Sequence, residues 1–307
     1  MEREQIRISV RNLVEFILRS GDIDNRRASL DTMEAMQAGS RLHRKIQKKM
    51  GSTYHAEVPL NIIIEEENYE LGIWGRADGI IIEETVTIDE IKGVYLSLDL
   101  LEEPVKVHLA QAKCYAYIYG IQNDLQKINV QMTYGNLDTG DLKYFSYEYS
   151  MQQLQEWFSD LILKYKKWAD FQYEWRKKRQ ASIKELAFPF PYREGQKELA
   201  AGVYRTIARK KNLFIQAPTG VGKTISTLYP AIKAVGEGLG DKIFYLTAKT
   251  VTANVAKETL GILCEKGYRA KSVQITAKEK LCPCEEVDCN PVSCPYAKGH
   301  FDRVNDA

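Results

Sequence analysis

The segment that most constrains this chain is the glycine-containing stretch APTGVGKT at residues 217–224. An apolar stretch, NLFIQA, ends at the start of this segment, and residues 223–235 have helical periodicity. Glycines let backbone N–H groups wrap closely around a phosphate at a helix N-terminus. The strict GxxxxGK[ST] pattern is not met, because its first glycine is Ala217 here. The segment nevertheless predicts binding of ATP and Mg²⁺ by Pro218, Thr219, Gly220, Val221, Gly222, Lys223 and Thr224.

Residues 185–307 have a pattern in which helices alternate with strands. Helices are expected at 196–209, 223–235 and 251–264, with strands at 212–217 and 242–248. This alternation predicts an α/β domain whose parallel sheet binds its ligand at the carboxyl ends of the strands.

Residues 1–184 have a different order, which predicts a separate domain. Helical periodicity at 12–50 is followed by three β-rich runs at 56–95, a helix at 104–120, two strands at 128–149 and a long helix at 151–179. The prolines of FPFPY, at 188–192, end the helical pattern. We therefore place the domain boundary between residues 184 and 185.

The long helix ends in a basic and aromatic stretch, KYKKWADFQYEWRKKRQ, at residues 164–180. Basic side chains hold phosphates and aromatic rings stack on bases, so a nucleic-acid surface is one interpretation. A solvated amphipathic helix that joins two domains is the other interpretation, and we favour it slightly.

Three residues of the β-rich segment have the chemistry of a metal-dependent phosphodiesterase. Asp78 lies in GRADGI, and Glu90 and Lys92 lie in TIDEIKG. Because side chains alternate along a strand, Glu90 and Lys92 share one face and Asp89 points to the other. Asp78 on the neighbouring strand can meet them. Carboxylates hold Mg²⁺ or Mn²⁺, and a basic group orients the attacking water.

This pattern resembles the PD-(D/E)XK nucleases, and more narrowly their RecB-like branch. The branch adds a histidine on the preceding helix, matched by His43, and a QxxxY motif on the following helix, matched by Gln111 and Tyr115. The resemblance implies an α/β/α domain in which four positions hold the metal ion: His43, Asp78, Glu90 and the carbonyl of Ile91. It also implies that Lys92 serves the water and that Gln111 and Tyr115 position Lys92 or the DNA.

Each of these residues alone has an ordinary structural interpretation. A single histidine is more often a surface or core residue, E-x-K on a strand is usually a solvated face, and Tyr115 is more often core. Their shared order on the right elements favours the nuclease. The alternative function is a catalytically inactive domain that binds DNA and loads an ATP-driven translocase.

The second domain resembles the XPD/DinG-like iron–sulfur helicases of superfamily 2. FPYREGQ, at 190–196, matches the segment in which a glutamine reads adenine, here Gln196. YLTAKTVTANV, at 245–255, resembles a motif that contacts the DNA backbone through Thr247 and Thr250, although helix capping explains Thr250 equally well. The resemblance implies a partial RecA-like motor domain.

Four cysteines within a short irregular stretch predict a metal centre: Cys282, Cys284, Cys289 and Cys294. TAKEKLC, at 276–282, resembles the run into the first cluster cysteine of these helicases, so we favour a [4Fe–4S] cluster over zinc. Cys284 is the least secure ligand, and Cys264 is the alternative.

The combined hypothesis is a metal-dependent DNA nuclease coupled to an ATP-dependent helicase that acts in repair or processing of DNA with single-stranded regions. The charged start MEREQIRISV and the absence of an apolar run near roughly 20 residues predict a cytoplasmic protein without a membrane partner. The missing later helicase motifs predict that the motor is truncated and that this chain hydrolyses ATP poorly.

Overall fold

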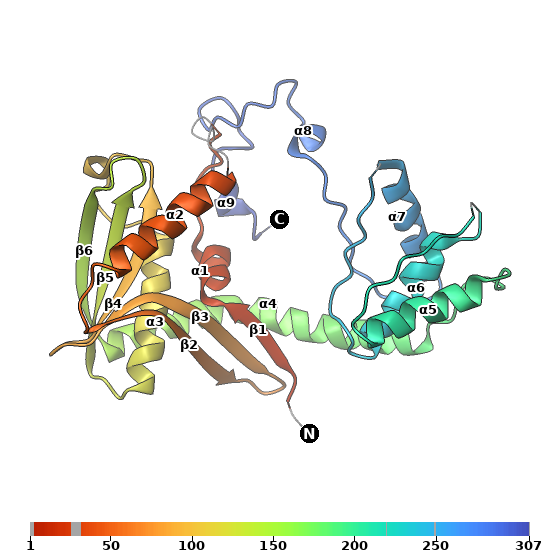
Figure 1. Cartoon of the computed structure of the whole chain (residues 1–307), viewed down its shortest axis with the longest axis horizontal. Helices are drawn as coiled ribbons and strands as arrows, with labels where there is room; N and C mark the ends of the chain where they lie inside the picture. The colour runs from red at the N-terminus through yellow and green to blue at the C-terminus, as the bar shows by residue number, and fades with distance from the viewer. Residues whose placement is uncertain (1–2, 26–31, 219, 249, 307) are drawn as a thin grey trace. The chain divides into compact units, whose positions relative to one another are not determined.

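The structure is a computed structural model that describes residues 3–25, 32–218, 220–248 and 250–306. The chain forms two compact units (Figure 1). The first unit contains Met1–Asp170 together with Cys284–Ala307, and the second contains Phe171–Pro283. The boundary inferred from the sequence, between residues 184 and 185, stays a prediction.

The first unit is built on a mixed six-stranded sheet. Its main path has the order β1-β3-β4-β5-β6, and β2 pairs with β3. β3–β4 and β5–β6 are antiparallel pairs, whereas β4 and β5 are parallel and are connected through a helix. The strands are β1 (Gln5–Ser9), β2 (Tyr54–Glu65), β3 (Glu70–Ile81), β4 (Thr87–Val94), β5 (Lys127–Asn136) and β6 (Leu142–Ser150).

Strand β3 is divided between two partners along one edge. Its first half pairs in parallel with β1, from Gln5↔Glu70 to Ser9↔Trp74, and its last residues, 79–81, pair with β4. Along its other edge β3 pairs with β2 over its whole length. No strand was predicted at Gln5–Ser9, whose sequence is QIRIS. A run of only five residues is a weak signal, and its pairing with β3 is what makes it a strand.

Helices cover both faces of the sheet. Leu42 and Ile46 of α2 pack against Ile91 of β4. On the opposite face, Gln111 of α3 hydrogen bonds to the next residue of β4, Lys92. The first unit is therefore an α/β/α arrangement, as expected for residues 1–184. Its helices include α1 (Val10–Leu18), α2 (Thr32–Gln47), the 3-10 turn η1 (Leu98–Leu100), α3 (Lys106–Gln122) and the short α9 (His300–Arg303).

The described part of the second unit is helical. Its core joins Ile183 and Leu186 to Ile232, Leu263 and other buried apolar side chains. Helix α4 (Met151–Glu185) contributes residues to both units. The other helices are α5 (Gln196–Ala208), α6 (Lys223–Gly236), α7 (Thr250–Glu265) and the one-turn α8 (Lys278–Leu281).

The two strands expected in this unit, at 212–217 and 242–248, are wrong for the residues described. Both segments are irregular. Their apolar side chains are exposed, and Phe214 and Leu246 are 96% and 88% accessible. An extended segment becomes a strand only when a neighbour satisfies its backbone groups, and neither segment has such a neighbour among the described residues. The described residues of this unit thus contain no parallel sheet, and the RecA-like domain stays a prediction.

Among the described residues, no helix has both the length and the apolar character that crossing a membrane requires.

The central strands of the first unit should dominate its stability. Ile128 of β5 is completely buried, so Ile128→Ala should lower the free energy of unfolding of this unit by about 3 kcal/mol. Ile63→Ala on β2 is the matched control, because Ile63 is 54% exposed and its loss should cost less than about 0.5 kcal/mol. Native-state hydrogen exchange in β4–β6 would measure both effects. Equal losses of protection in the two variants would contradict this placement of the core.

Candidate nuclease site and nucleotide loop

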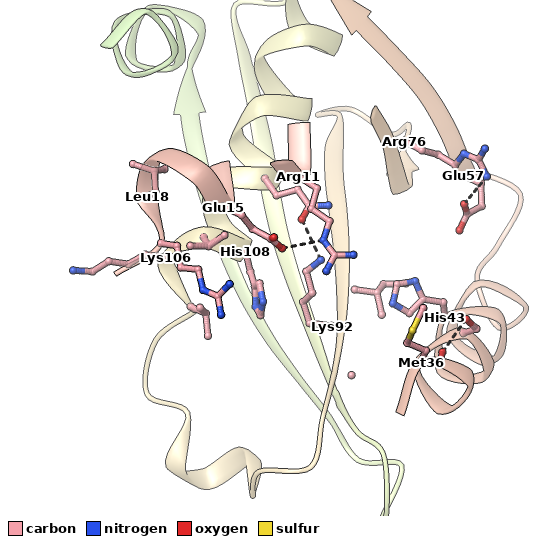
Figure 2. Close-up of a pocket in the computed structure, with 18 of the residues that line it drawn as sticks. Arg11, Glu15, Leu18, Met36, His43, Glu57, Arg76, Lys92, Lys106 and His108 are labelled. Atoms are coloured by element: carbon pink, nitrogen blue, oxygen red, sulfur yellow. Dashed lines mark hydrogen bonds and ion pairs between the residues drawn. The ribbon is translucent and has the colours of Figure 1, made fainter. Parts of the chain in front are cut away.

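An open cavity of about 1340 Å³ lies beside strand β4 in the first unit. Residues of α1, α2, β4 and α3 line it, and Lys92, His43 and His108 point toward it from three of these elements (Figure 2). The lining is mainly cationic: it includes Arg11, Arg19, Arg44, Arg76, Lys92 and Lys106, against the acidic residues Glu15, Asp22 and Glu57. Such a surface attracts polyanions.

Strand β4 supplies the acidic and basic pair at the centre of the site. Lys92 Nζ lies 2.7 Å from Glu90 Oε1 and donates a second hydrogen bond to Gln111 Oε1 at 3.3 Å. Gln111 Nε2 in turn donates to the Tyr115 hydroxyl at 3.4 Å, since positions i and i+4 share one helix face. The four residues therefore form one chain of polar contacts that runs from the strand to α3.

Tyr115 comes very close to the backbone of β3. A Cβ atom at Gly75 would lie 2.6 Å from the Tyr115 ring, so only glycine leaves room for the ring. Burial raises the pKa of the Tyr115 hydroxyl, which therefore stays protonated at neutral pH. Tyr115 packs the middle of α3 against the sheet and accepts a hydrogen bond from Gln111, which contacts Lys92.

Glu90 is a buried carboxylate with an incomplete set of partners. Its side chain is completely inaccessible, and Oε2 accepts no hydrogen bond. Burial raises the pKa of Glu90 to about 8, the positive charge of Lys92 opposes this rise and the negative charge of Asp78 adds to it. An orphaned buried oxygen beside a second carboxylate fits a divalent cation, which would lower that pKa and satisfy the oxygen. The residues present thus fit a metal ion.

Asp78 connects β4 to helix α2. Its Oδ2 accepts a hydrogen bond from the Ile91 N–H at 2.8 Å, and its Oδ1 lies 3.4 Å from His43 Nδ1. Gln47 of α2 also donates to the Asp78 carbonyl at 3.0 Å. The structure therefore brings together His43, Asp78, Glu90, Ile91, Lys92, Gln111 and Tyr115, whose individual roles stay predictions. Asp89, on the other face, bonds to Thr133 and Tyr54 instead.

Two further residues of the site were not found from the sequence. Glu57 of β2 has a carboxylate near His43 and Asp78. His108 of α3 lines the cavity and shares a 3.0 Å hydrogen bond with the Tyr134 hydroxyl. Glu57 stands in no motif, and only the register of β2 against β3 brings it to the site. The one sequence signal for His108 is its position about one helical turn before Gln111, which places both side chains on the same side of α3.

The glycine loop of the second unit leads directly into α6. Gly220 and Gly222 have positive φ values of 88° and 79°, and Gly222 is the N-cap of the helix. Lys223 Nζ donates to the carbonyls of Ala217 and Pro218 at 2.9 Å each, so it is folded back onto the loop. Thr224 lies in the first turn of α6. Thr219 lies outside the described residues.

Gln196 is placed on the loop backbone. It is 3% exposed, donates to the Val221 carbonyl at 3.1 Å and accepts from the Arg193 N–H at 3.0 Å. A Cβ at Gly222 would lie 2.6 Å from the Gln196 amide nitrogen, so this position also requires glycine. In this arrangement Gln196 supports the loop.

The cysteines are divided between the two units. Cys284, Cys289 and Cys294 share a small cluster with Ile23 and Ala297 in the first unit, whereas Cys264 and Cys282 belong to the second unit. Thiolates around one zinc ion lie within about 3.8 Å of one another, given Zn–S bonds of about 2.3 Å. Among the described residues, no three cysteine sulfurs lie within 4.8 Å of one another. The [4Fe–4S] cluster and the zinc alternative both stay predictions.

Comparison with known proteins gives a local match. No family model matches the chain. A stretch of 51 residues is 51% identical to a probable ATP-dependent helicase from Methanocaldococcus jannaschii. This stretch is related to helicases. It is 16% of this chain and only 8% of the relative, so the chain spans a small part of that relative. The crystal structure of SSO0001 aligns with 53% of this chain and 78% of its own, at 20% identity and a TM-score of 0.34, which is too low to assign a fold.

The half-buried histidine of the cavity, His108, should make the first unit sensitive to acid. Burial, followed by the positive charge of Lys92, lowers the pKa of His108 from 6.5 to about 4. Between these values the unfolded chain binds the proton and the folded unit does not, so stability falls as the pH is lowered from 6.5 toward 4. Glu15, which opposes the shift, and Arg11 also face the ring.

His108→Gln should flatten this acid-dependent loss of stability because it removes the titrating group. Urea unfolding midpoints at about pH 7 and about pH 4.5 would measure the decline. Tyr134→Phe is the control: it removes the hydroxyl that bonds to His108 but keeps the histidine, so the decline should persist. An unchanged decline in His108→Gln would show that other groups cause it.

Proposed function

We propose that this chain carries a metal-dependent DNA nuclease site coupled to an ATP-dependent DNA helicase of the XPD/DinG type. The protein would act in the cytoplasm, in repair or processing of DNA with single-stranded regions. The observation that carries the proposal is Glu90, a buried carboxylate that pairs with Lys92 through one oxygen and has no hydrogen-bond partner at the other, on the strand that Asp78 contacts at the Ile91 N–H. The helicase part rests on the local match to a probable ATP-dependent helicase and on the loop that leads into α6.

The nuclease residues have separable tasks in this proposal. His43, Asp78, Glu90 and the Ile91 carbonyl would hold Mg²⁺ or Mn²⁺, and the ion would polarise the phosphate and lower the pKa of a water. Lys92 would orient that water. Lys92 could accept a proton from the water only after its own ammonium group had lost a proton. Gln111, held by Tyr115, keeps the Lys92 ammonium at the site.

The walls of the cavity would bind the DNA backbone. Arg11, Arg44 and Lys106 line the cavity from three different helices, α1, α2 and α3. They offer positive charge but no pattern that would distinguish one base from another. Contacts of this kind position a phosphate backbone but do not read its sequence. We therefore propose a nuclease that selects DNA by its strand structure and has little preference for base sequence.

Substitutions at the site should separate metal binding from cleavage. Lys92→Ala should lower Mn²⁺-dependent cleavage of labelled single-stranded DNA by at least about 100-fold while Mn²⁺ still binds. Asp78→Ala should lose both Mn²⁺ binding and DNA cleavage. Lys127→Ala is the matched control, because Lys127 is exposed and pairs only with Glu148 on the neighbouring strand.

Two outcomes would contradict the nuclease. Cleavage that survives Asp78→Ala or Lys92→Ala would come from elsewhere. Tight DNA binding by a folded preparation with no cleavage in any divalent metal would favour the DNA-binding module that loads a translocase.

The glycine loop should bind nucleotide through Lys223. Lys223→Ala should weaken binding of a fluorescent ATP analogue by about tenfold or more, because the ammonium that reaches the phosphates is lost. Lys257→Ala, on the exposed side of α7, is the control and should bind normally. The binding is measured by fluorescence anisotropy with Mg²⁺ present. Equal affinity in Lys223→Ala and the unsubstituted chain would sink the ATP site.

A further inference from the structure

Glu57 stands directly across from Asp78 in the sheet. β2 and β3 pair through Ala56↔Gly79 and Val58↔Ala77, which sets Glu57 opposite Asp78. β3 and β4 pair through Gly79↔Asp89, and the next step of this register sets Asp78 opposite Glu90. Three carboxylates therefore form one row across three adjacent strands.

A row of like charges on neighbouring strands is unfavourable unless cations offset it. Lys92 pairs with Glu90 at 2.7 Å, and the exposed Arg76 approaches Glu57 at 3.4 Å. Asp78, in the middle of the row, has His43 at 3.4 Å as its one possible cationic partner in the described part of the chain.

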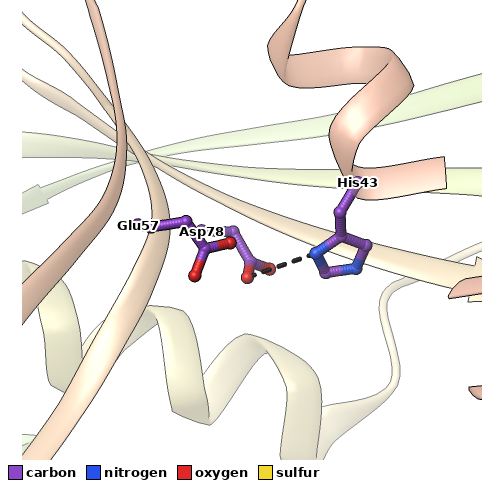
Figure 3. A group of neighbouring side chains, drawn as sticks. All are labelled: His43, Glu57 and Asp78. Atoms are coloured by element: carbon purple, nitrogen blue, oxygen red, sulfur yellow. Dashed lines mark ion pairs between the residues drawn. The ribbon is translucent and has the colours of Figure 1, made fainter. Parts of the chain in front are cut away.

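The side chains of His43, Glu57 and Asp78 point into one small space (Figure 3). One ligand atom from each lies within 4.8 Å of the other two, and no other group of three such residues is found in the described part of the chain. Glu57 reaches this space from a left-handed backbone with φ of 57°, a conformation that residues other than glycine rarely adopt. A second sign of a cation comes from Glu90, one strand further along the row, whose buried Oε2 has no hydrogen-bond partner.

We propose that Glu57 is a further ligand of the divalent cation at His43 and Asp78, and that it leaves Arg76 to bind the metal. A set of two carboxylates and one imidazole suits Mn²⁺. Mg²⁺ would bind at the same place with fewer of these protein ligands. The present partners of Glu57 are easily exchanged, because Arg76 is 66% exposed and Gln47 donates at 3.2 Å. The inference rests on the proposed nuclease site, to which it adds a residue that no motif assigns.

The test measures Mn²⁺ binding to the full chain without DNA, by isothermal titration calorimetry. Glu57→Gln keeps the shape of the side chain and removes its charge, so it should weaken Mn²⁺ binding by about tenfold or more. Arg76→Ala removes the competing cation and should strengthen binding by up to about fivefold, the effect of one exposed ion pair. Glu83→Gln is the control, because Glu83 is exposed and accepts a hydrogen bond from the Thr53 hydroxyl outside the carboxylate row.

The two variants separate ligation from a structural role. If Glu57 mattered only through its ion pair with Arg76, both substitutions would weaken Mn²⁺ binding, and that result would overturn the proposal. Unchanged affinity in Glu57→Gln would also overturn it, even if Asp78→Ala and Lys92→Ala abolish cleavage. Mn²⁺ binding that depends on Glu57 in a chain that never cleaves DNA would support the ligand and sink the nuclease.

Discussion

The burial of Glu90 in the middle of the sheet is the constraint on which the site depends. A carboxylate without access to water must be neutral or compensated, and only one of its oxygens is compensated, by Lys92. Ile91, the next residue of β4, is packed in the core beneath α2. This packing fixes the strand, so the Glu90 side chain cannot turn toward solvent. The sheet therefore holds a carboxyl group whose charged form needs a further cation beside it. A cation at this point would stabilise the fold and serve the chemistry at once.

The local part of this arrangement could be predicted from the sequence. Alternation along a strand places Glu90 and Lys92 on one face, and a separation of four residues places Gln111 and Tyr115 on one side of a helix. These are short-range rules, and the contacts follow them. The longer-range contact of Asp78 with the Ile91 N–H required only that two neighbouring strands pair as a hairpin.

The parts that could not be predicted depend on register or on tertiary partners. Glu57 reaches Asp78 only because β2 pairs with β3 in one register, and a slip of one residue would turn its side chain to the other face. β1 is a strand because β3 offers it a free edge. The segments at 212–217 and 242–248 show the opposite case, because their apolar composition is typical of strands but no other described segment pairs with them.

The cysteine-bearing segment and the wall of the cavity are joined by direct contacts within the first unit. The N–H groups of Ile23 and Asn25 donate to the carbonyls of Ala297 and Cys289, at 3.0 and 3.1 Å. Nearby, the Arg19 guanidinium lies 3.6 Å from the centre of the Phe301 ring, and both residues line the cavity. Because backbone hydrogen bonds fix both stretches of chain at once, ordering one costs less when the other is already ordered. The cysteines and this side of the cavity therefore form together, although about 260 residues separate the two stretches in the sequence.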